Sequence, residues 1–235
     1  MQKETVPNSH NPRQDVSKIR KRLIAAKDKG FEIFNDTVAF PRDARIIKEI
    51  VAKHRTNEDT RPSRVVDIGS GTGGLGKALH DIGVNVVSTD IENWHHHNGT
   101  VPFVRATADR LPFGTDTFDV STLWFVLHHT DDPVKVLKEA ARVSDLVIVQ
   151  EDTVRTDGPK WWRQLQQITY ERHVENFQII NTNSRSTPTS YTNDDWLTSF
   201  EKAGLEVVEA KQVHKPGNPV RKIQYVLKES ETIFK

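Results

Sequence analysis

Two carboxylates and a pair of histidines close apolar runs of the chain, at Asp67, Asp90, His128 and His129. A carboxylate at the end of a buried strand is unfavourable unless a cation or a hydrogen-bond donor pairs with it. A carboxylate in this position can also accept both hydroxyls of a ribose. Imidazole titrates nearest to neutral pH, so the histidines are the natural candidates for moving a proton. These positions predict a site for a nucleoside-like ligand.

The first carboxylate lies just before a glycine-dense turn that joins a predicted strand to a predicted helix. The turn begins at Gly69 and the helical spacing of apolar residues ends at Gly83. Glycine lets the backbone approach a ligand closely, and the free N–H groups at a helix start favour a polar or anionic ligand group. The spacing of Gly69, Gly71 and Gly74 also satisfies the dinucleotide-binding fingerprint. The glycines alone therefore do not exclude a nicotinamide cofactor.

Further strands follow in an α/β order. Val84 to Asp90 is the second predicted strand and ends within about 20 residues of the glycine turn, which gives a right-handed parallel unit. Val101 to Arg105 is the third. The continuous apolar run from Phe118 to His129 predicts a strand buried on both faces, and Leu146 to Val149 predicts a fifth that ends in Gln150, Glu151 and Asp152.

After residue 191, the sequence predicts a helix from Thr192 to Gly204 and then a hairpin from Leu205 to Leu227. Before the glycine turn we expect a disordered tail over residues 1–15 and two helices within residues 16–62, the first of them basic. The main domain is then 63–235. Its polar, aromatic insertion over 153–191 is too long for a simple connection and is predicted to be a lid.

The motifs resemble those of a known family. Val65 to Gly73 (Val-Val-Asp-Ile-Gly-Ser-Gly-Thr-Gly) resembles motif I of class I S-adenosylmethionine-dependent methyltransferases. Phe118 to Asp132 resembles the Phe-Asp…Leu-His-His-x-x-Asp segment of the ubiquinone and menaquinone biosynthesis type, methyltransferase type 11. The resemblance covers Arg64 to Ala141, and in architecture it continues to Lys228. It implies an α/β, Rossmann-like, seven-stranded, mostly parallel sheet with a C-terminal antiparallel hairpin and helices on both faces.

The resemblance also implies which residues bind S-adenosylmethionine. The methionine part would lie among Asp67 and the turn, with a backbone contact near Trp124; the ribose would lie at Asp90, and the adenine at the loop of Asp109. The full implied set is Asp67, Gly69, Ser70, Gly71, Gly73, Asp90, Ile91, Ala108, Asp109, Arg110 and Trp124. One departure from the family is Arg142 to Asp145, where a lysine-proline and double-glycine turn is usual.

Catalysis needs few dedicated groups, because methyl transfer from a sulfonium depends mainly on alignment. If the acceptor is a hydroxyl, a base near the cofactor sulfur would help. Strand alternation would let only one of the two histidines point into the pocket, and we favour His129 over His128. With an acceptor that is already nucleophilic, proximity alone would be enough.

Composition limits the alternatives. The 235 residues carry a formal net charge of +1 and no cysteine. The near-zero net charge gives no broad electrostatic attraction for nucleic acid. The absence of cysteine excludes thiolate metal sites. It also fits a reducing compartment, so we expect a cytoplasmic protein. No run is long enough to span a membrane. Three consecutive histidines, His95 to His97, cannot all point at one ion, so no metal site is expected.

Three functions fit these observations: a small-molecule methyltransferase, a nucleic-acid (tRNA or rRNA) methyltransferase, and a non-catalytic protein that binds S-adenosylmethionine. The charge and the aromatic lid favour the first, with a small-molecule substrate as partner. A nicotinamide oxidoreductase would explain the glycines and Asp90, but it would explain neither Asp67 nor the blocks around Asp109 and His128. The oligomeric state is left open.

Overall fold

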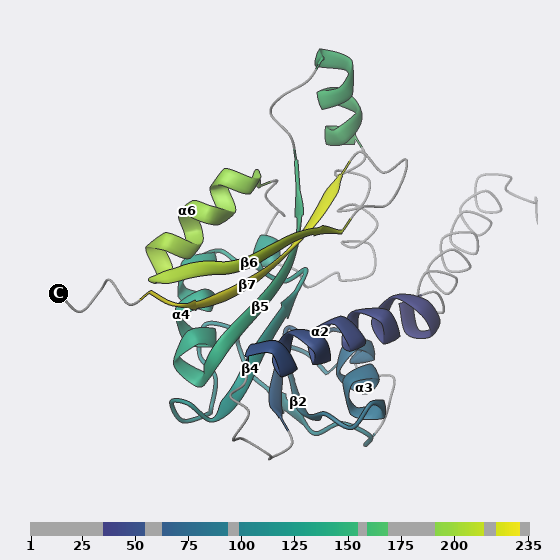
Figure 1. Ribbon diagram of the computed structural model, residues 1–235, viewed down its shortest axis with the longest axis vertical. Coiled ribbons are helices and arrows are strands. Elements are labelled where there is room, and N and C mark those ends of the chain that lie inside the picture. The colour runs from purple at the N-terminus through teal and green to yellow at the C-terminus, as the bar shows by residue number, and fades with distance from the viewer. Residues whose placement is uncertain are drawn as a thin grey trace, which may run out of the picture.

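A seven-stranded sheet in the order β3-β2-β1-β4-β5-β7-β6 organises the molecule (Figure 1). The computed structural model describes residues 35–54, 63–93, 99–154, 159–168, 191–213 and 220–230. The strands are β1 (Arg64–Ile68), β2 (Asn85–Asp90), β3 (Phe103–Arg105), β4 (Phe118–Trp124), β5 (Ser144–Thr153), β6 (Leu205–Val213) and β7 (Arg221–Glu229). The helical elements are a π-helical turn η1 (Asn35–Ala39), α2 (Phe40–His54), α3 (Gly74–Asp81), a 3-10 turn η2 (Leu127–His129), α4 (Pro133–Val143) and α6 (Asn193–Ala203). Residues 160–168 are also helical.

The strand directions confirm the predicted fold class. Strands β3, β2, β1, β4 and β5 pair in parallel, whereas β7 pairs antiparallel with both β5 and β6. All five parallel strands therefore place their carboxyl ends at one edge of the sheet, where α/β proteins bind ligands.

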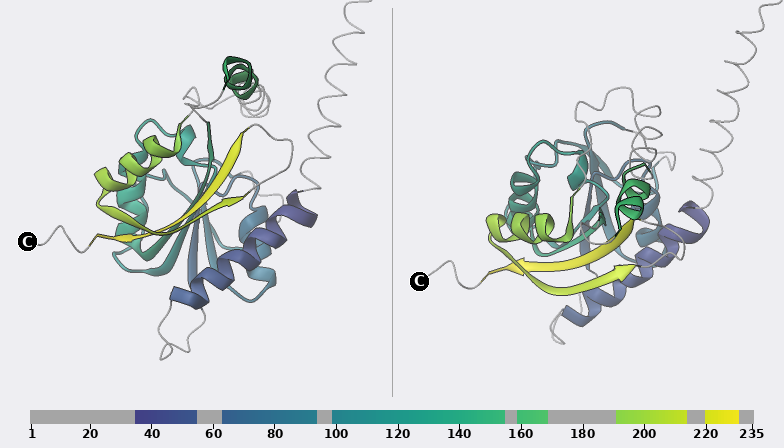
Figure 2. Two further views of the ribbon diagram at one scale, coloured as in Figure 1. Left: turned by 45° about the horizontal axis from the view of Figure 1, so that its top comes forward. Right: turned by 90° about the horizontal axis from the view of Figure 1, so that it is seen from above.

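Helices cover both faces of the sheet, as Figure 2 shows. One core cluster joins α2 and α3 to the sheet through residues such as Ile47, Leu79 and Ile148. The other joins α4 and α6 to the opposite face through residues such as Leu137, Trp196 and Tyr225. The central strands are buried from both sides, which explains their nearly continuous apolar sequences.

The strand expected over Phe118 to His129 is shorter than predicted. It ends at Trp124, because Phe125 has a positive φ of 58°, a conformation that breaks the ladder. The two histidines consequently lie in the 3-10 turn η2 rather than at a strand end. Strand β5, in contrast, extends to Thr153 and includes Glu151 and Asp152.

Several expectations fall outside the described residues. They are the tail over 1–15, the basic first helix of the segment 16–62, the triplet His95 to His97, and residues 155–158 and 169–190 of the predicted lid.

Candidate functional site

The glycine turn meets the end of β2 at Asp90. The Gly71 amide donates to Asp90 Oδ2 at 2.9 Å, and the Glu92 amide donates to Asp90 Oδ1 at 3.2 Å. The Ser70 amide donates to the Thr89 carbonyl at 2.9 Å, which fixes the turn against the strand end. Two of the predicted ligand contacts, Gly71 and Asp90, are therefore held together by a direct hydrogen bond.

The turn is packed on one side and open on the other. A Cβ atom on Gly69 would lie 2.6 Å from the Val126 side chain, and one on Gly74 would lie 2.5 Å from the Phe40 ring. At Gly71, where φ is 53°, a Cβ atom would meet nothing within 4 Å. The open side is the space into which a ligand could approach the backbone.

Asp67 lies beneath this turn with only 1% of its surface exposed. Its Oδ1 accepts a hydrogen bond from Thr122 Oγ1 at 2.9 Å, but Oδ2 has no hydrogen-bond partner among the described residues. Burial, together with a smaller effect of the Asp90 charge, raises the pKa of Asp67 to about 7, although the Thr122 hydroxyl and the Gly76 amide lower it. A cationic ligand group nearby would favour the ionised form.

The loop that carries Asp109 lies beside Asp90. Strand β3 pairs with β2 so that Arg105 is opposite Asp90, and the Ala106 amide donates to the Asp90 carbonyl at 3.0 Å. The chain then turns through Ala108, Asp109 and Arg110, closed by a 3.0 Å bond from the Arg110 amide to the Thr107 carbonyl. Ala108 is half-buried, whereas Asp109, Arg110 and Ile91 are exposed.

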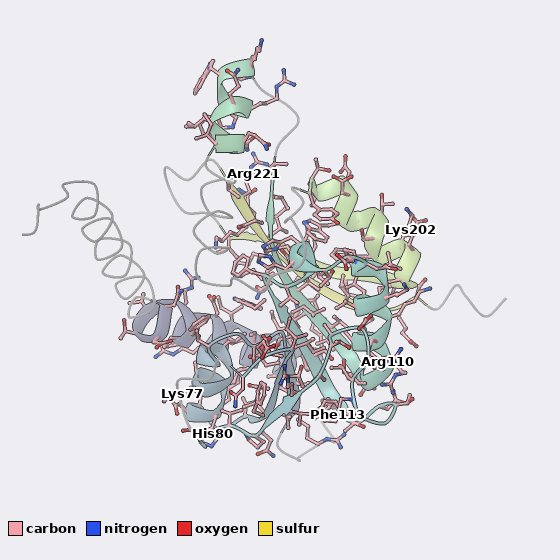
Figure 3. The ribbon with its side chains drawn as sticks, turned by 180° about the vertical axis from the view of Figure 1, so that it is seen from behind. Lys77, His80, Arg110, Phe113, Lys202 and Arg221 are labelled. Atoms are coloured by element: carbon pink, nitrogen blue, oxygen red, sulfur yellow. The ribbon has the colours of Figure 1, made fainter. Side chains whose placement is uncertain are left out.

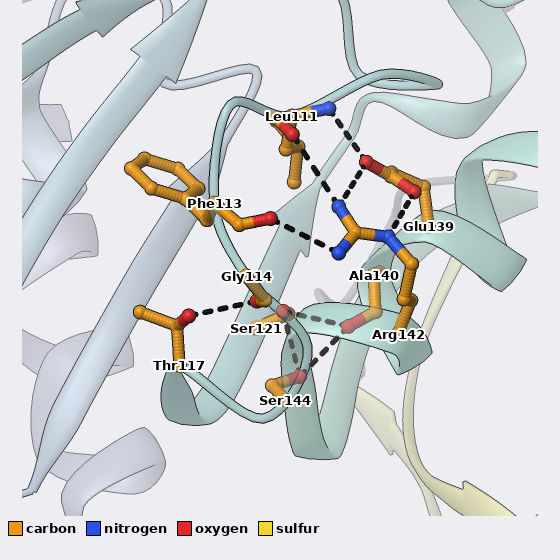
Figure 4. A network of polar contacts seen from close by, with 9 residues as sticks. All are labelled: Leu111, Phe113, Gly114, Thr117, Ser121, Glu139, Ala140, Arg142 and Ser144. Atoms are coloured by element: carbon orange, nitrogen blue, oxygen red, sulfur yellow. Dashed lines mark hydrogen bonds and ion pairs between the residues drawn. The ribbon is translucent and has the colours of Figure 1, made fainter.

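A salt bridge on α4 fixes the next part of this loop (Figure 4). Arg142 donates to the carbonyls of Phe113 (3.0 Å) and Leu111 (3.3 Å) and pairs with Glu139 at 2.7 Å. Glu139 in turn accepts from the Leu111 amide at 2.6 Å. Arg142 belongs to the segment that departs from the family pattern, and the sequence alone did not predict that it holds the loop after Asp109.

Trp124 is the last residue of β4, and its side chain contacts α2. The indole Nε1 donates to Asp43 Oδ2 of α2 at 3.1 Å, and Asp43 also pairs with Arg42 at 2.7 Å. Both Trp124 and Asp43 are buried. The side chain therefore joins α2 to β4, a contact that the sequence did not indicate because Asp43 lies far from Trp124 in the chain.

The two histidines have different surroundings. His128 is buried, and its Nδ1 lies 2.5 Å from Glu151 Oε2; the other carboxylate oxygen accepts from the Leu127 amide at 2.7 Å. Burial lowers the pKa of His128, but the Glu151 carboxylate outweighs burial and the net shift is upward. Within the part of the chain that the structure describes, His128 Nε2 has no hydrogen-bond partner. His129 is half-buried, with its ring centroid 4.0 Å from that of His128.

Known proteins are similar to this chain in sequence and in fold. The model of a methyltransferase domain family matches residues 40–210. The chain belongs to this methyltransferase family. A demethylmenaquinone methyltransferase of Renibacterium salmoninarum is 28% identical over 136 residues, which cover 54% of this chain and 55% of the relative. The ubiquinone/menaquinone biosynthesis C-methyltransferase UbiE of Proteus mirabilis is 32% identical over 149 residues, 55% of this chain and 58% of the relative. The chain thus spans little more than half the length of these relatives.

The solved structures agree on the methyltransferase fold. The 1,6-didemethyltoxoflavin-N1-methyltransferase of Burkholderia thailandensis, solved with S-adenosylhomocysteine bound, has a TM-score of 0.59 at 15% identity and covers 97% of this chain and 94% of its own. The resemblance to class I S-adenosylmethionine-dependent methyltransferases is confirmed at the level of the family and the fold. None of the helices that the structure describes is long and apolar enough to cross a membrane.

Proposed function

We propose that this chain transfers a methyl group from S-adenosylmethionine to a small-molecule acceptor at the carboxyl edge of its sheet. The observation that carries the proposal is the hydrogen bond between the Gly71 amide and Asp90. It joins the open glycine turn to the acid that the family uses for the ribose, with the buried Asp67 directly below.

The proposed contacts follow the cofactor from one end to the other. The methionine part lies against Asp67 and the turn of Gly69, Ser70, Gly71 and Gly73, and its amine meets the backbone near Trp124. The ribose hydroxyls donate to Asp90, with Ile91 beside them. The adenine lies against Ala108 and Arg110, and its amino group donates to Asp109.

A small acceptor is supported by charge and by the relatives. The net charge of +1 gives no broad attraction for a polyanion. The relatives named above are methyltransferases of demethylmenaquinone and of ubiquinone and menaquinone biosynthesis, and the structural neighbour from Burkholderia was solved with 1,6-didemethyltoxoflavin bound. We propose an acceptor of comparable size, in the cytoplasm, covered by the aromatic segment 153–191.

The aromatic residues in the described part of this segment have two kinds of surroundings. Tyr191 stacks on Trp196 with ring centroids 4.2 Å apart, so it packs on the body of the domain. Trp161 is 63% exposed in the helix over 160–168, where it makes an edge contact with Trp162. We propose that Trp161 belongs to the part of the lid that closes over the acceptor.

The His128–Glu151 pair is the proposed proton acceptor. The bound cofactor would supply a methyl group on a positively charged sulfur to an acceptor hydroxyl. The proton of that hydroxyl passes to His128 Nε2, while Glu151 holds Nδ1 and stabilises the resulting imidazolium. The preference for His129 thus moves to His128, because its carboxylate partner is in place.

Calorimetry with S-adenosylhomocysteine and with NAD tests the cofactor, and the Asp90→Ala variant tests the site. We expect binding of the first ligand only, weakened in the variant by about 1.5 to 3 kcal/mol, the scale of charge-assisted hydrogen bonds. Asp81→Ala, an exposed acid on α3, is the matched control. Tight NAD binding without S-adenosylhomocysteine binding would refute the assignment.

Transfer of labelled methyl groups into a metabolite extract, with tRNA and rRNA in parallel, tests the acceptor class. We expect label in the small-molecule fraction. Label in RNA alone would support the nucleic-acid alternative, and binding without transfer would support a non-catalytic protein.

A further inference from the structure

A second set of polar side chains lies on β5 and β7, away from the residues assigned above. In the antiparallel pair, Gln150 is opposite Gln224 and Asp152 is opposite Lys222. The side chains of these four residues lie on the same face of the sheet as those of Ile148 and Val226, because alternate residues of a strand point to the same side. This face is the one covered by α2, whereas Val149 and Tyr225 pack on the α4 side.

Two atoms of this set are buried without the hydrogen bonds that burial requires. Gln224 is 3% exposed and its Nε2, a donor, has no partner in the described structure; Asp152 is 7% exposed and its Oδ1, an acceptor, likewise has no hydrogen bond. The Lys222 ammonium is 3.8 Å from Asp152 Oδ1, which is an ion pair but is too long for a hydrogen bond. An unsatisfied buried polar group is unfavourable by about 1–3 kcal/mol, so a donor and an acceptor that both lack a hydrogen bond on one face would gain stability from a ligand that pairs with both.

The position of the set fits an acceptor site. Gln150 is also the parallel partner of Trp124, so the set begins one strand away from the end of β4, where the methionine part is proposed to lie. Neighbouring strands are about 4.8 Å apart, so Gln224 lies about two strand spacings from that end. Phe125 follows Trp124 directly, and Lys222 Nζ of this set lies 3.9 Å from the centre of the Phe125 ring. Arg221, at the start of β7, lies away from Arg110 and Phe113 of the adenine loop, as Figure 3 shows.

We propose that Gln224 and Asp152 bind the polar edge of a planar acceptor that carries a carbonyl and a hydrogen-bond donor on adjacent atoms, as a lactam or a hydroxy-ketone does. Gln224 Nε2 donates to the carbonyl, and Asp152 Oδ1 accepts from the neighbouring N–H or O–H. Asp152 and Gln224 are diagonal neighbours on one sheet face, a separation that such an edge can bridge. The proposal rests on the proposed function, because it names the acceptor class for the same site.

Two matched pairs of probes test this proposal on the full chain by calorimetry, with and without S-adenosylhomocysteine. 2-Quinolone has the lactam edge and 1-methyl-2-quinolone lacks its donor; 3-hydroxychromone has the hydroxy-ketone edge and chromone lacks its donor. We expect at least one edge-bearing probe to bind about tenfold more tightly than its partner, the difference of roughly one charge-assisted hydrogen bond. The pair of probes that shows this difference in affinity identifies whether the site prefers a lactam or a hydroxy-ketone.

Two variants then separate the two halves of the edge. Asp152→Leu, which removes the acceptor oxygens, should abolish the preference within a pair, whereas Gln224→Met should weaken both members of the pair alike. Gln212→Met, at an exposed position of β6, is the matched control and should change neither.

Equal affinity of the wild-type protein for both members of each pair would overturn the proposal without any variant. If the wild-type protein does not bind S-adenosylhomocysteine, the proposed function is refuted. The comparison of the probes in the absence of that ligand would still show whether Gln224 and Asp152 bind the polar edge.

Discussion

Asp67 is the residue whose ionisation the fold controls most directly. Its carboxyl is buried, one oxygen is open, and burial raises its pKa to about 7. Because the shift is upward, the neutral form prevails below pH 7 in the free protein, and a sulfonium or ammonium nearby would drive the proton off.

Binding of S-adenosylmethionine should therefore release a proton at pH 6 and almost none at pH 8. Calorimetry in buffers of different ionisation enthalpy measures this release directly. Asp67→Asn should remove the pH dependence while leaving the fold intact. Heats that do not depend on the buffer at pH 6 would show that Asp67 is not linked to the cofactor.

His128 should set the pH dependence of the reaction. Because Glu151 raises its pKa above the usual 6.5, the neutral imidazole that can accept a proton forms only as the pH rises through that higher value. We expect kcat/KM to increase with pH along a limb above 6.5. His128→Ala should lose the limb together with about 100-fold in rate, the lower range for general-base catalysis.

Two further variants distinguish the roles of the neighbouring groups in this profile. Glu151→Gln should move the limb to lower pH, since burial alone lowers the pKa of His128. His129→Ala should retain the limb. If His128→Ala keeps the wild-type profile, proximity with a nucleophilic acceptor is the better account.

At the scale of elements, the loop between β3 and β4 depends on a helix that follows it in the chain. Arg142 and Glu139 of α4 hold the carbonyls of Leu111 and Phe113 and the Leu111 amide. The loop begins at the turn that contains Asp109, so α4 limits where the proposed adenine contact can lie.

Arg142→Ala should reduce the affinity for S-adenosylhomocysteine by about three- to tenfold, the range expected for loss of one or two hydrogen bonds. S-inosylhomocysteine, which lacks the adenine amino group, separates positioning from general loosening. If Arg142 acts through Asp109, the preference for the adenine form shrinks in the variant. An unchanged preference contradicts that role. Lys138→Ala, at an exposed position of the same helix, is the control.

Local sequence patterns predicted most of these elements. The glycine turn, the start of α6 at Thr192 and its stop at Gly204 depend on neighbouring residues only, and they were predicted correctly. The end of β4 was not, because the positive φ of Phe125 has no sequence signal comparable to a glycine. The Trp124–Asp43 and Arg142–Leu111 contacts were missed because each joins residues that are distant in the chain.

At the scale of the whole molecule, α2 connects the glycine turn to the centre of the sheet. Its first residue, Phe40, fills the space beside Gly74, and Asp43 receives the indole N–H of Trp124. The helix thereby closes one side of the turn and covers the sheet face from which the proposed acceptor site extends.

Asp43→Ala should lower the free energy of unfolding by about 1 to 3 kcal/mol, because it leaves the buried indole N–H without an acceptor. Chemical denaturation measures this loss, with Glu49→Ala at an exposed position of α2 as the control. Asp43→Asn keeps an oxygen for the indole and should recover part of the stability. Equal stability of Asp43→Ala and the wild type would show that the contact does not hold α2 in place.

The sheet order also has a consequence for the newly made chain. Strand β7 follows β6 in the sequence but lies between β5 and β6, and the described part of β6 pairs with no other strand. During synthesis, β1 to β5 and the proposed cofactor residues leave the ribosome before β7, the strand that carries Gln224. A ribosome-bound chain halted before β7 should therefore capture S-adenosylhomocysteine while it still fails to distinguish 2-quinolone from its N-methyl derivative.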